Sequence, residues 1–177
     1  MSDYRRDRVP GGTYFFTVTL HDRHSDLLVT HVNALRTAVR QARDHAPFHI
    51  DAWVVLPDHM HCLRTLPSND ADFPSRWRAI KTAFSKSLPI TEPRSPTMRN
   101  RGERGIWQRR YWEHTIRDDR DYASHMDYTH FNPVKHGYVQ HPADWPYSSF
   151  RRCAAAGMYA QEWCGGDDNP HDAGERR

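Results

Sequence analysis

Residues 48–66 read FHIDAWVVLPDHMHCLRTL, two apolar runs that are separated by Pro57 and Asp58. Each run is long enough for a strand and rich in the β-branched and aromatic residues that strands favour. Proline followed by aspartate is typical of a tight turn, so the two runs are predicted to form a hairpin. The first run is so dense in apolar residues that we expect it in the centre of the sheet.

Further elements are predicted on both sides of this hairpin. They are a strand at 13–20 after Gly11 and Gly12, a helix at 30–45 capped by Thr30, a helix at 73–88, a short strand at 113–116, and a helix at 119–131 capped by Asp118. This order predicts an α+β fold with a ferredoxin-like antiparallel sheet and helices packed on one face. The last helix is an addition to that pattern, and an irregular C-terminal extension is expected after Pro133.

The 177-residue chain has 37% hydrophobic and 12% aromatic residues, which is enough for one buried core. We expect a single domain over residues 1–164 with a mobile basic loop at 89–105, and a disordered tail at 165–177. No apolar stretch suits a membrane span or a signal peptide, so a soluble, cytoplasmic protein with no membrane partner is predicted. The three cysteines form no CxxC pair, which predicts reduced thiols and no structural zinc.

Positive charge is concentrated between residues 76 and 117, which hold eleven basic and three acidic residues, whereas the whole chain has a formal charge of only +3. Aromatic residues are interleaved with the basic ones. Because cations follow a phosphate backbone and aromatic rings stack on unpaired bases, the segment is typical of single-stranded nucleic-acid binding. The alternative is a solvated basic surface above core aromatics. Within the helix at 73–88, Arg76, Lys81 and Lys86 are predicted to point to solvent or ligand.

His59 and His61 are separated only by Met60. Alternate side chains of a strand share a face, so the two imidazoles are predicted to lie together. Such a pair supplies half of a metal site; the alternative is that both are half-buried polar residues. Cys62 would point to the opposite face, which makes a zinc site with this thiol poor. Mg²⁺ or Mn²⁺, held also by an amide or carboxylate oxygen, fits better.

The predicted helix at 119–131 helps to choose among the eight tyrosines. At 3.6 residues per turn, Tyr128 and Asn132 fall on one polar face, whereas Tyr122 falls on the other side among apolar residues. We therefore expect Tyr122 in the core, and Tyr128 beside the histidines with Asn132 as a third ligand. Two alternatives remain open: Tyr128 as an amphipathic surface ring, and Asn132 as the residue that ends the helix before Pro133.

A tyrosine beside a metal is suited to cleaving a phosphodiester. Attack by the Tyr128 phenol would give a 5′-phosphotyrosyl link and a free 3′-OH, which conserves bond energy for strand joining. A metal on His59, His61 and Asn132 would polarise a non-bridging oxygen and orient the phosphate. Phenols have an ordinary pKa of about 10 and need activation, and the sequence identifies no base.

Several motifs occur together along the chain. They are Gly11, Gly12 and Thr13; residues 53–61, with His59, Met60 and His61; residues 107–117; Asp127 with Tyr128; residues 132–137; and residues 145–150. Two histidines around a hydrophobic residue form an HUH motif. With these motifs the chain resembles the REP-associated tyrosine transposases, single-tyrosine HUH transposases that are linked to repetitive extragenic palindromic (REP) DNA. The resemblance covers about residues 4–164.

The resemblance implies a ferredoxin-like domain that binds and nicks single-stranded DNA near a palindromic hairpin, at a short G-containing sequence. It implies Tyr128 as the nucleophile, and His59, His61 and Asn132 as ligands of a divalent metal, Mg²⁺ or Mn²⁺. DNA contacts are expected from Arg5, Arg6, Gly11, Gly12, Thr13, Arg76, Arg78, Lys81, Trp107, Arg109, Arg110 and Lys135. The long loop at 89–105 departs from the family pattern.

We therefore expect a hairpin-specific endonuclease and strand transferase. One alternative is a non-catalytic regulator, derived from such a transposase, that binds DNA hairpins. Another is a replication or conjugation initiator of the HUH type, for which the chain is short. Insertion-sequence relatives act as dimers that exchange the tyrosine helix. Residues 140–165 follow the helix here and would cover that surface, so a monomer is favoured over a homodimer.

Overall fold

A four-stranded antiparallel sheet forms the centre of the computed structural model, which describes residues 8–160 and 162–165. Its strands are β1 (Thr13–Thr19), β2 (His49–Val55), β3 (His59–Thr65) and β4 (Trp112–Thr115), in the order β2-β3-β1-β4. The predicted α+β class and the hairpin of β2 with β3 are confirmed. Arg5, Arg6 and all of the predicted tail except Gly165 lie outside the described residues.

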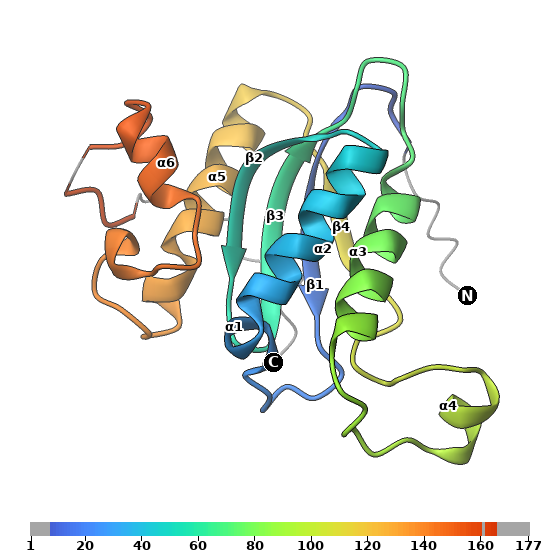
Figure 1. Cartoon of the computed structure of the whole chain (residues 1–177). Helices are drawn as coiled ribbons and strands as arrows, with labels where there is room; N and C mark the ends of the chain where they lie inside the picture. The colour runs from blue at the N-terminus through green and yellow to red at the C-terminus, as the bar shows by residue number, and fades with distance from the viewer. Residues whose placement is uncertain (1–7, 161, 166–177) are drawn as a thin grey trace, which may run out of the picture.

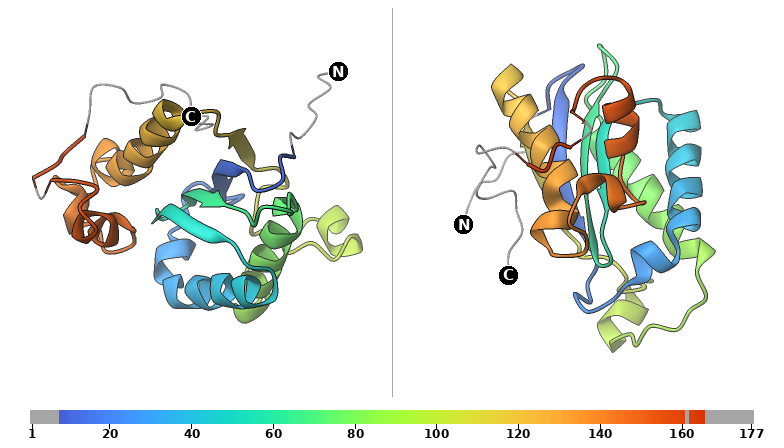
Figure 2. Two further views of the ribbon diagram at one scale, coloured as in Figure 1. Left: turned by 90° about the horizontal axis from the view of Figure 1, so that it is seen from above. Right: turned by 90° about the vertical axis from the view of Figure 1, so that its left-hand side faces the viewer.

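Helices cover both faces of this sheet. They are α1 (Leu27–Thr30), α2 (Val32–His45), α3 (Phe73–Ser87), α4 (Pro96–Asn100), α5 (Asp119–Lys135), the 3₁₀ helix η1 (Pro142–Asp144) and α6 (Phe150–Ala155). Helices α2 and α3 pack on one face, and α5 lies across the other (Figure 1 and Figure 2). No helix in the described ranges is both long and apolar enough to cross a membrane.

The alternation of side chains along β1 and β3 divides the core into two layers. Tyr14, Phe16 and Val18 of β1, with Met60 and Cys62 of β3, belong to the cluster shared with α2 and α3. A smaller cluster under α5 contains Phe15, Ala52, Leu63, Met126, Tyr128 and Cys153. The two histidines of β3 alternate with Met60 and Cys62, so they lie on the α5 face.

The position of β2 corrects the prediction that this strand is central, because β2 is at the edge of the sheet. Residues 147–149 run beside it. The Val55 N–H donates to the Tyr147 carbonyl over 2.8 Å, and the Ser149 N–H donates to the Trp53 carbonyl over 2.8 Å. This segment satisfies exposed edge groups and buries the strand, which explains an apolar density that is typical of central strands.

Helix α5 is longer than predicted, because it passes through Pro133 and ends at Lys135. Asp118 caps it as expected, since its carboxylate accepts a hydrogen bond from the Asp121 N–H over 2.8 Å. Proline removes one donor, yet the next turn still closes through the His136 N–H and the Asn132 carbonyl, 3.0 Å apart. The prediction that the helix ends at Phe131 was therefore wrong by one turn.

Other boundaries differ from the sequence-based expectation in smaller ways. Thr30 is not a cap but the last residue of α1, because Leu28 is buried and draws an extra helical turn onto the core. Helix α6 and η1 lie in the region that was predicted to be irregular. Strand β4 begins one residue earlier than expected.

The basic loop at 89–105 contains α4 and is attached to α3 through one arginine. Arg104 donates to the carbonyls of Ser85, Leu88 (2.9 Å) and Pro89 (2.7 Å), and it pairs with Glu92. The last carbonyls of α3 are poorly satisfied, since Ser85 accepts only a long bond of 3.4 Å from the Leu88 N–H, and a guanidinium matches their partial negative charge. The pairing with Arg104 lowers the pKa of Glu92 to about 2.

Candidate active site

The imidazoles of His59 and His61 lie side by side on β3, with ring centroids 5.1 Å apart and ring planes at 81°. Both side chains are buried, with exposed fractions of 2% and 0%. The HxH spacing predicted that they share a face, and they do. A half-buried polar pair, the alternative, does not describe rings that are removed from water to this extent.

Each ring is held through its Nδ1 atom. Asp58 Oδ1 lies 2.7 Å from His59 Nδ1, and Thr17 Oγ1 lies 2.9 Å from His61 Nδ1. Oxygen partners at one ring nitrogen are the usual support of metal-binding histidines, because they fix the tautomer and aim Nε2 at the ion. Burial raises the pKa of Asp58, but the hydrogen bond to His59 and the charge of Arg23 lower it more. The pKa of this carboxyl group is therefore below its ordinary value.

Tyr128 lies over this pair. Its ring centroid is 5.2 Å from that of His61, at an edge-to-face angle of 74°, and its side chain is only 2% exposed. Lys135 Nζ donates a hydrogen bond to the Tyr128 hydroxyl over 3.1 Å and lies 4.6 Å from the ring centroid. The exposed Lys135 thus covers a buried phenol and brings a positive charge to its oxygen.

Asn132 is bracketed by two residues of the same helix face. Tyr128, Asn132 and His136 follow one another at four-residue steps, so they form one row along α5. Tyr128 meets His61, and the His136 ring lies 5.3 Å from His59. Asn132, fully buried, therefore lies at the level between the two imidazoles.

His136 was not predicted to belong to the site. A helix that ended at Phe131 would have released the chain before this residue, so the row was cut short. The signal in the sequence was the spacing itself, because residues 128, 132 and 136 continue one helical face if Pro133 is accepted near a helix end.

The predicted polar face of the helix that carries Tyr128 is buried, so the alternative of Tyr128 as an amphipathic surface ring does not hold. His125, Tyr128 and Asn132 are all buried against the sheet. Tyr122, which was expected in the core, is only partly buried and donates a hydrogen bond to Asp51 over 3.0 Å. Burial, helped by the Asp51 carboxylate, raises the pKa of Tyr122, so this phenol is held in its neutral form.

A second group of metal-binding residue types lies beside the first site. His114 of β4 meets Asp121 at 2.8 Å, and His125 Nδ1 meets the same carboxylate at 3.0 Å. Phe15 packs against both His125 and His61, so it separates the two groups. The sequence did not indicate this group, because its members belong to two different elements, β4 and the start of α5, that only the short turn between them brings together.

His114, Asp121 and His125 have suitable donor atoms, within 4.8 Å of one another, for a cation. However, the two imidazoles are stacked, with centroids 4.6 Å apart and planes at 14°. A metal lies close to the plane of each imidazole that binds it, and nearly parallel planes at this separation do not meet at one such point. In this geometry the group is a hydrogen-bonded network that joins β4 to the start of α5.

Three of the predicted DNA contacts lie on α3, across the sheet from the histidines. Arg76 is 3% exposed, and its guanidinium donates to the carbonyls of Ala46, Pro47 and Asp72 and pairs with Asp70. The prediction that Arg76 points to solvent or ligand was wrong, because these acceptors hold it inside the protein. Arg78 is exposed on the outer side of α3, and Lys81 is partly buried.

The remaining contacts lie at two other places. Gly11, Gly12 and Thr13 begin β1, where Gly11 has a φ of +69° and its N–H donates to the Asp70 carbonyl over 3.0 Å. Trp107, Arg109 and Arg110 lie between the basic loop and β4; both arginines are exposed. Only Lys135, among the predicted and described DNA contacts, touches the tyrosine.

Comparison with known proteins identifies the family. No family model matches the chain, but the REP-associated tyrosine transposase of Escherichia coli strain K12 is 48% identical over 99% of this chain and 98% of its own length. A protein of Haemophilus influenzae with the same family name is 48% identical over 95% of this chain and 96% of its own.

A similar fold is also found among solved structures. The structure of a REP-associated tyrosine transposase bound to a REP hairpin matches with a TM-score of 0.85 and 48% identity, over 100% of this chain and 99% of that one. The sequence similarity extends over nearly the full length of this chain, and the fold is the same. The chain therefore belongs to the family of REP-associated tyrosine transposases.

Proposed function

We propose that this transposase cleaves and rejoins single-stranded DNA beside a palindromic hairpin, with Tyr128 as the nucleophile. The observation that carries the proposal is the contact of the Tyr128 ring with His61, at a centroid distance of 5.2 Å, above a buried pair of histidines. The similar solved protein is bound to a REP hairpin, which supports the same class of ligand for this chain.

In the proposed step, the Tyr128 oxygen attacks the scissile phosphorus. The P–O3′ bond breaks, the 3′ oxygen leaves and takes up a proton, and the phosphate remains on Tyr128 as a 5′-phosphotyrosyl ester. The phenolic proton is lost during attack. Because one phosphoester replaces another, the free 3′-OH of a second strand can reverse the step and join to the held 5′ end without an external energy source.

Lys135 is the group that acts on the tyrosine oxygen. Its ammonium lies 3.1 Å from that oxygen, so it stabilises negative charge as the phenolic proton leaves. The exposed lysine also lies where a phosphate would enter, and there it would neutralise charge in the transition state. It thus supplies part of the activation that the sequence left unassigned.

The residues around Tyr128 fit a divalent metal. His59 and His61 are supported at Nδ1 by Asp58 and Thr17. The buried Asn132 belongs to the same α5 row as Tyr128 and His136, whose rings meet His61 and His59. This arrangement supports His59, His61 and Asn132 as ligands. Two imidazoles and an amide oxygen suit Mg²⁺ or Mn²⁺ better than a soft ion. When bound, the ion would polarise a non-bridging phosphate oxygen and orient the phosphorus toward the phenol.

The protein is proposed to work as a monomer. Tyr128 lies over the histidines of its own chain, so a second subunit is not needed to complete the site. The 3₁₀ helix η1 packs against α5, and α6 packs against η1, so residues that follow α5 cover part of this helix (Figure 2). Sedimentation of the purified protein is expected to show the mass of one chain, and a stable dimer would contradict this.

The test uses labelled single-stranded palindromes from the flanks of the protein's own gene, incubated with Mg²⁺ or Mn²⁺. A denaturing gel should reveal a covalent complex. Tyr128→Phe should abolish this complex while hairpin binding persists. Tyr122→Phe is the matched control, since it removes another hydroxyl of the same helix and should retain the complex.

The second candidate is a regulator that binds the hairpin without cutting it. It would bind with equal strength in chelator and form no covalent complex with any palindrome. Undiminished complex formation by Tyr128→Phe would overturn the assignment of the nucleophile.

A further inference from the structure

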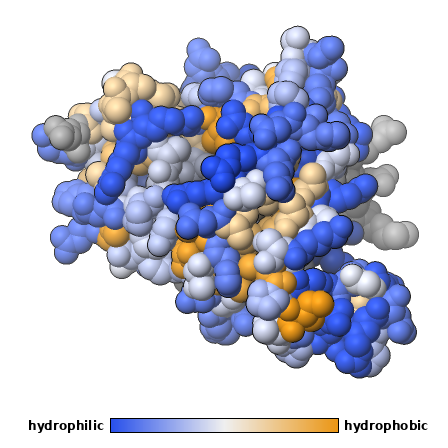
Figure 3. All heavy atoms as spheres, in the orientation of Figure 1, coloured by the Kyte–Doolittle hydropathy of each residue, from blue (hydrophilic) through white to orange (hydrophobic). Residues whose placement is uncertain are grey.

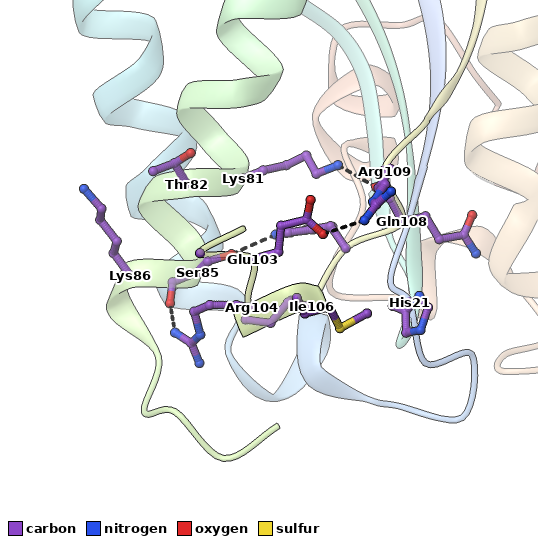
Figure 4. Close-up of a pocket in the computed structure, with 14 residues that line it drawn as sticks. His21, Lys81, Thr82, Ser85, Lys86, Glu103, Arg104, Ile106, Gln108 and Arg109 are labelled. Carbon is purple, nitrogen blue, oxygen red and sulfur yellow. Dashed lines mark hydrogen bonds and ion pairs between the residues drawn. The ribbon is translucent and has the colours of Figure 1, made fainter. Parts of the chain in front are cut away.

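One feature that the proposed chemistry leaves unused is a pocket between α3 and the end of the basic loop (Figure 4). It has a volume of about 780 Å³. Lys81, Ser85 and Lys86 form its α3 side, and Glu103 through Arg109 form the opposite wall. The face drawn in Figure 3 is mostly hydrophilic, with hydrophobic residues scattered over it.

This pocket is built by specific contacts. Arg104 ties the loop to the last carbonyls of α3, as described above. The Trp107 indole donates a hydrogen bond to Ser85 Oγ over 3.0 Å and packs edge-to-face on Phe84 at 5.4 Å. The wall formed by residues 103–109 is therefore attached to α3, which forms the other wall, and these contacts fix the space between the two.

The lining is cationic and aromatic. Four basic side chains, from Lys81, Lys86, Arg104 and Arg109, are opposed by the single carboxylate of Glu103. Lys81 donates to the Gln108 carbonyl over 2.8 Å and lies 5.6 Å from the Trp107 ring centroid, and burial lowers its pKa to about 8. A desolvated ammonium of this kind gains from an arriving anion.

Arg109 is ready to change partners. Its ion pair with Glu103 spans 3.0 Å, and the two side chains are 62% and 37% exposed. An exposed pair of this kind contributes little to stability, so exchange of the carboxylate for a phosphate costs little. Figure 4 shows Lys81 reaching from α3 toward the Gln108 main chain and Arg109 paired with Glu103 beside it.

The pocket adjoins the histidine end of the sheet. The Gln108 N–H donates to the Thr19 carbonyl over 3.0 Å, and Thr19 is the partner of His59 in the strand register. Two strand spacings, about 10 Å, therefore separate His59 from the pocket wall. Because α3 and the histidines lie on opposite faces of the sheet, a strand held at the histidines reaches the pocket by passing around the edge segment beside β1.

We propose that this pocket binds one unpaired nucleotide of the DNA strand that is cut, with its phosphate between Lys81 and Arg109 and its base against Trp107. The inference rests on the proposed function for its ligand, and it adds a site that would set which nucleotide lies at a fixed distance from the cleaved bond. Bases stack on indole rings with little regard to sequence. The pocket would therefore fix the position of the strand relative to the cleaved bond, and would not select one base.

The test measures binding without chemistry, by fluorescence anisotropy in chelator. The probes are one hairpin without a tail and the same hairpin with a 5′ or a 3′ single-stranded tail. Arg109→Gln and Lys81→Met each remove one charge from the pocket, and Arg40→Gln removes one exposed charge from α2, away from every predicted DNA contact, as the matched control. Circular dichroism checks that each variant is folded.

The pocket variants should lose roughly tenfold in affinity for one tailed probe and bind the bare hairpin as the wild type does. Arg40→Gln should change neither affinity. A 5-iododeoxyuridine placed along that tail should crosslink to the peptide that contains Trp107 at one position only.

Three results would overturn the proposal that this pocket binds a nucleotide of the DNA tail. One is equal weakening of bare and tailed probes, which indicates general charge attraction. Another is an unchanged affinity of Arg109→Gln for both tails, which removes the phosphate contact even if Lys81→Met does not fold. The third is displacement of the tail by a free deoxynucleoside monophosphate, which points to a mononucleotide site. Covalent complex formation is scored separately, so the proposed function can stand or fail independently.

Discussion

Replacing Asp58 by asparagine tests the metal site without touching a proposed ligand. The carboxylate is 7% exposed and bonds to His59 Nδ1 over 2.7 Å. A buried, charge-assisted hydrogen bond contributes about 1.5–3 kcal/mol, which corresponds to about 10–100-fold in affinity. Mutations of such supporting partners cost metal sites a similar factor. Asparagine keeps the shape and an acceptor oxygen, so we expect the lower half of this range, with Asp58→Ala at the upper end.

The assay follows covalent complex formation across a series of Mn²⁺ concentrations. In Asp58→Asn, the half-saturating Mn²⁺ concentration should rise by about tenfold or more, while the rate at saturation changes little. Arg23→Gln is the control, because Arg23 pairs with the same carboxylate from a side chain that is 40% exposed. An ion pair of that kind is worth at most about 1 kcal/mol, so the control should move the midpoint by less than about fivefold.

Two results would refute this reasoning. A lower plateau rate with an unchanged Mn²⁺ midpoint would separate Asp58 from metal binding, and with it the assignment of His59 as a ligand. An equally large shift in Arg23→Gln would mean that the ion pair, and not the orientation of the imidazole, supports the site.

Three further predictions concern α5 and its contacts. Lys135→Met should slow complex formation by about 10–100-fold, because a charge-assisted hydrogen bond to the Tyr128 oxygen is lost. Lys135→Arg should recover part of the rate. A wild-type rate in the methionine variant would contradict this prediction. Burial lowers the pKa of His130 to about 3, whereas an unfolded chain takes up the proton near 6.5, so urea unfolding should show stability that is full above pH 6.5 and falls steadily toward pH 3. In His130→Gln this fall should be shallower, and an identical slope would refute the assignment. His114→Gln should cost about 1–2 kcal/mol of stability with or without chelator, since its bond to Asp121 is a hydrogen bond; destabilisation of the wild type by chelator alone would instead indicate a metal there.

The sequence predicted the fold well where one local signal decided the structure. The turn at Pro57 and Asp58 and the alternation around His59 and His61 are properties of a few adjacent residues, and both appear as expected. Apolar density alone misplaced β2, because the segment that covers its edge comes almost a hundred residues later.

The failures at Arg76 and Pro133 have different physical causes, the first distant in the sequence and the second local. Arg76 was read as a surface charge, but the carbonyls that bury it belong to the α2–β2 turn. Pro133 was read as a helix end, but a proline within the last turn removes only one donor, so α5 carries His136 to His59. Partners supplied by distant parts of the chain leave no trace in a local pattern.

The start of α5 decides which chain supplies the tyrosine. Only residues 116–118 separate β4 from α5, and they span at most about 10 Å when extended. The Arg117 N–H and His114 both bind the Asp121 carboxylate, so this link is held to its own sheet. From that fixed start, two helical turns bring Tyr128 over His61 of the same chain.

An exchange of α5 between subunits would have to break this network at β4. Mixing Tyr128→Phe with His61→Gln therefore should not restore complex formation, because neither protein has both an intact tyrosine and an intact histidine pair at one site. A swapped dimer would assemble one intact site from the two variants, at up to about a quarter of the wild-type sites if subunits pair freely, because half of the dimers are mixed and each mixed dimer has one intact site. Recovery of complex in the mixture, absent from each protein alone, would show that the helix leaves its own sheet during the reaction, whatever its resting position.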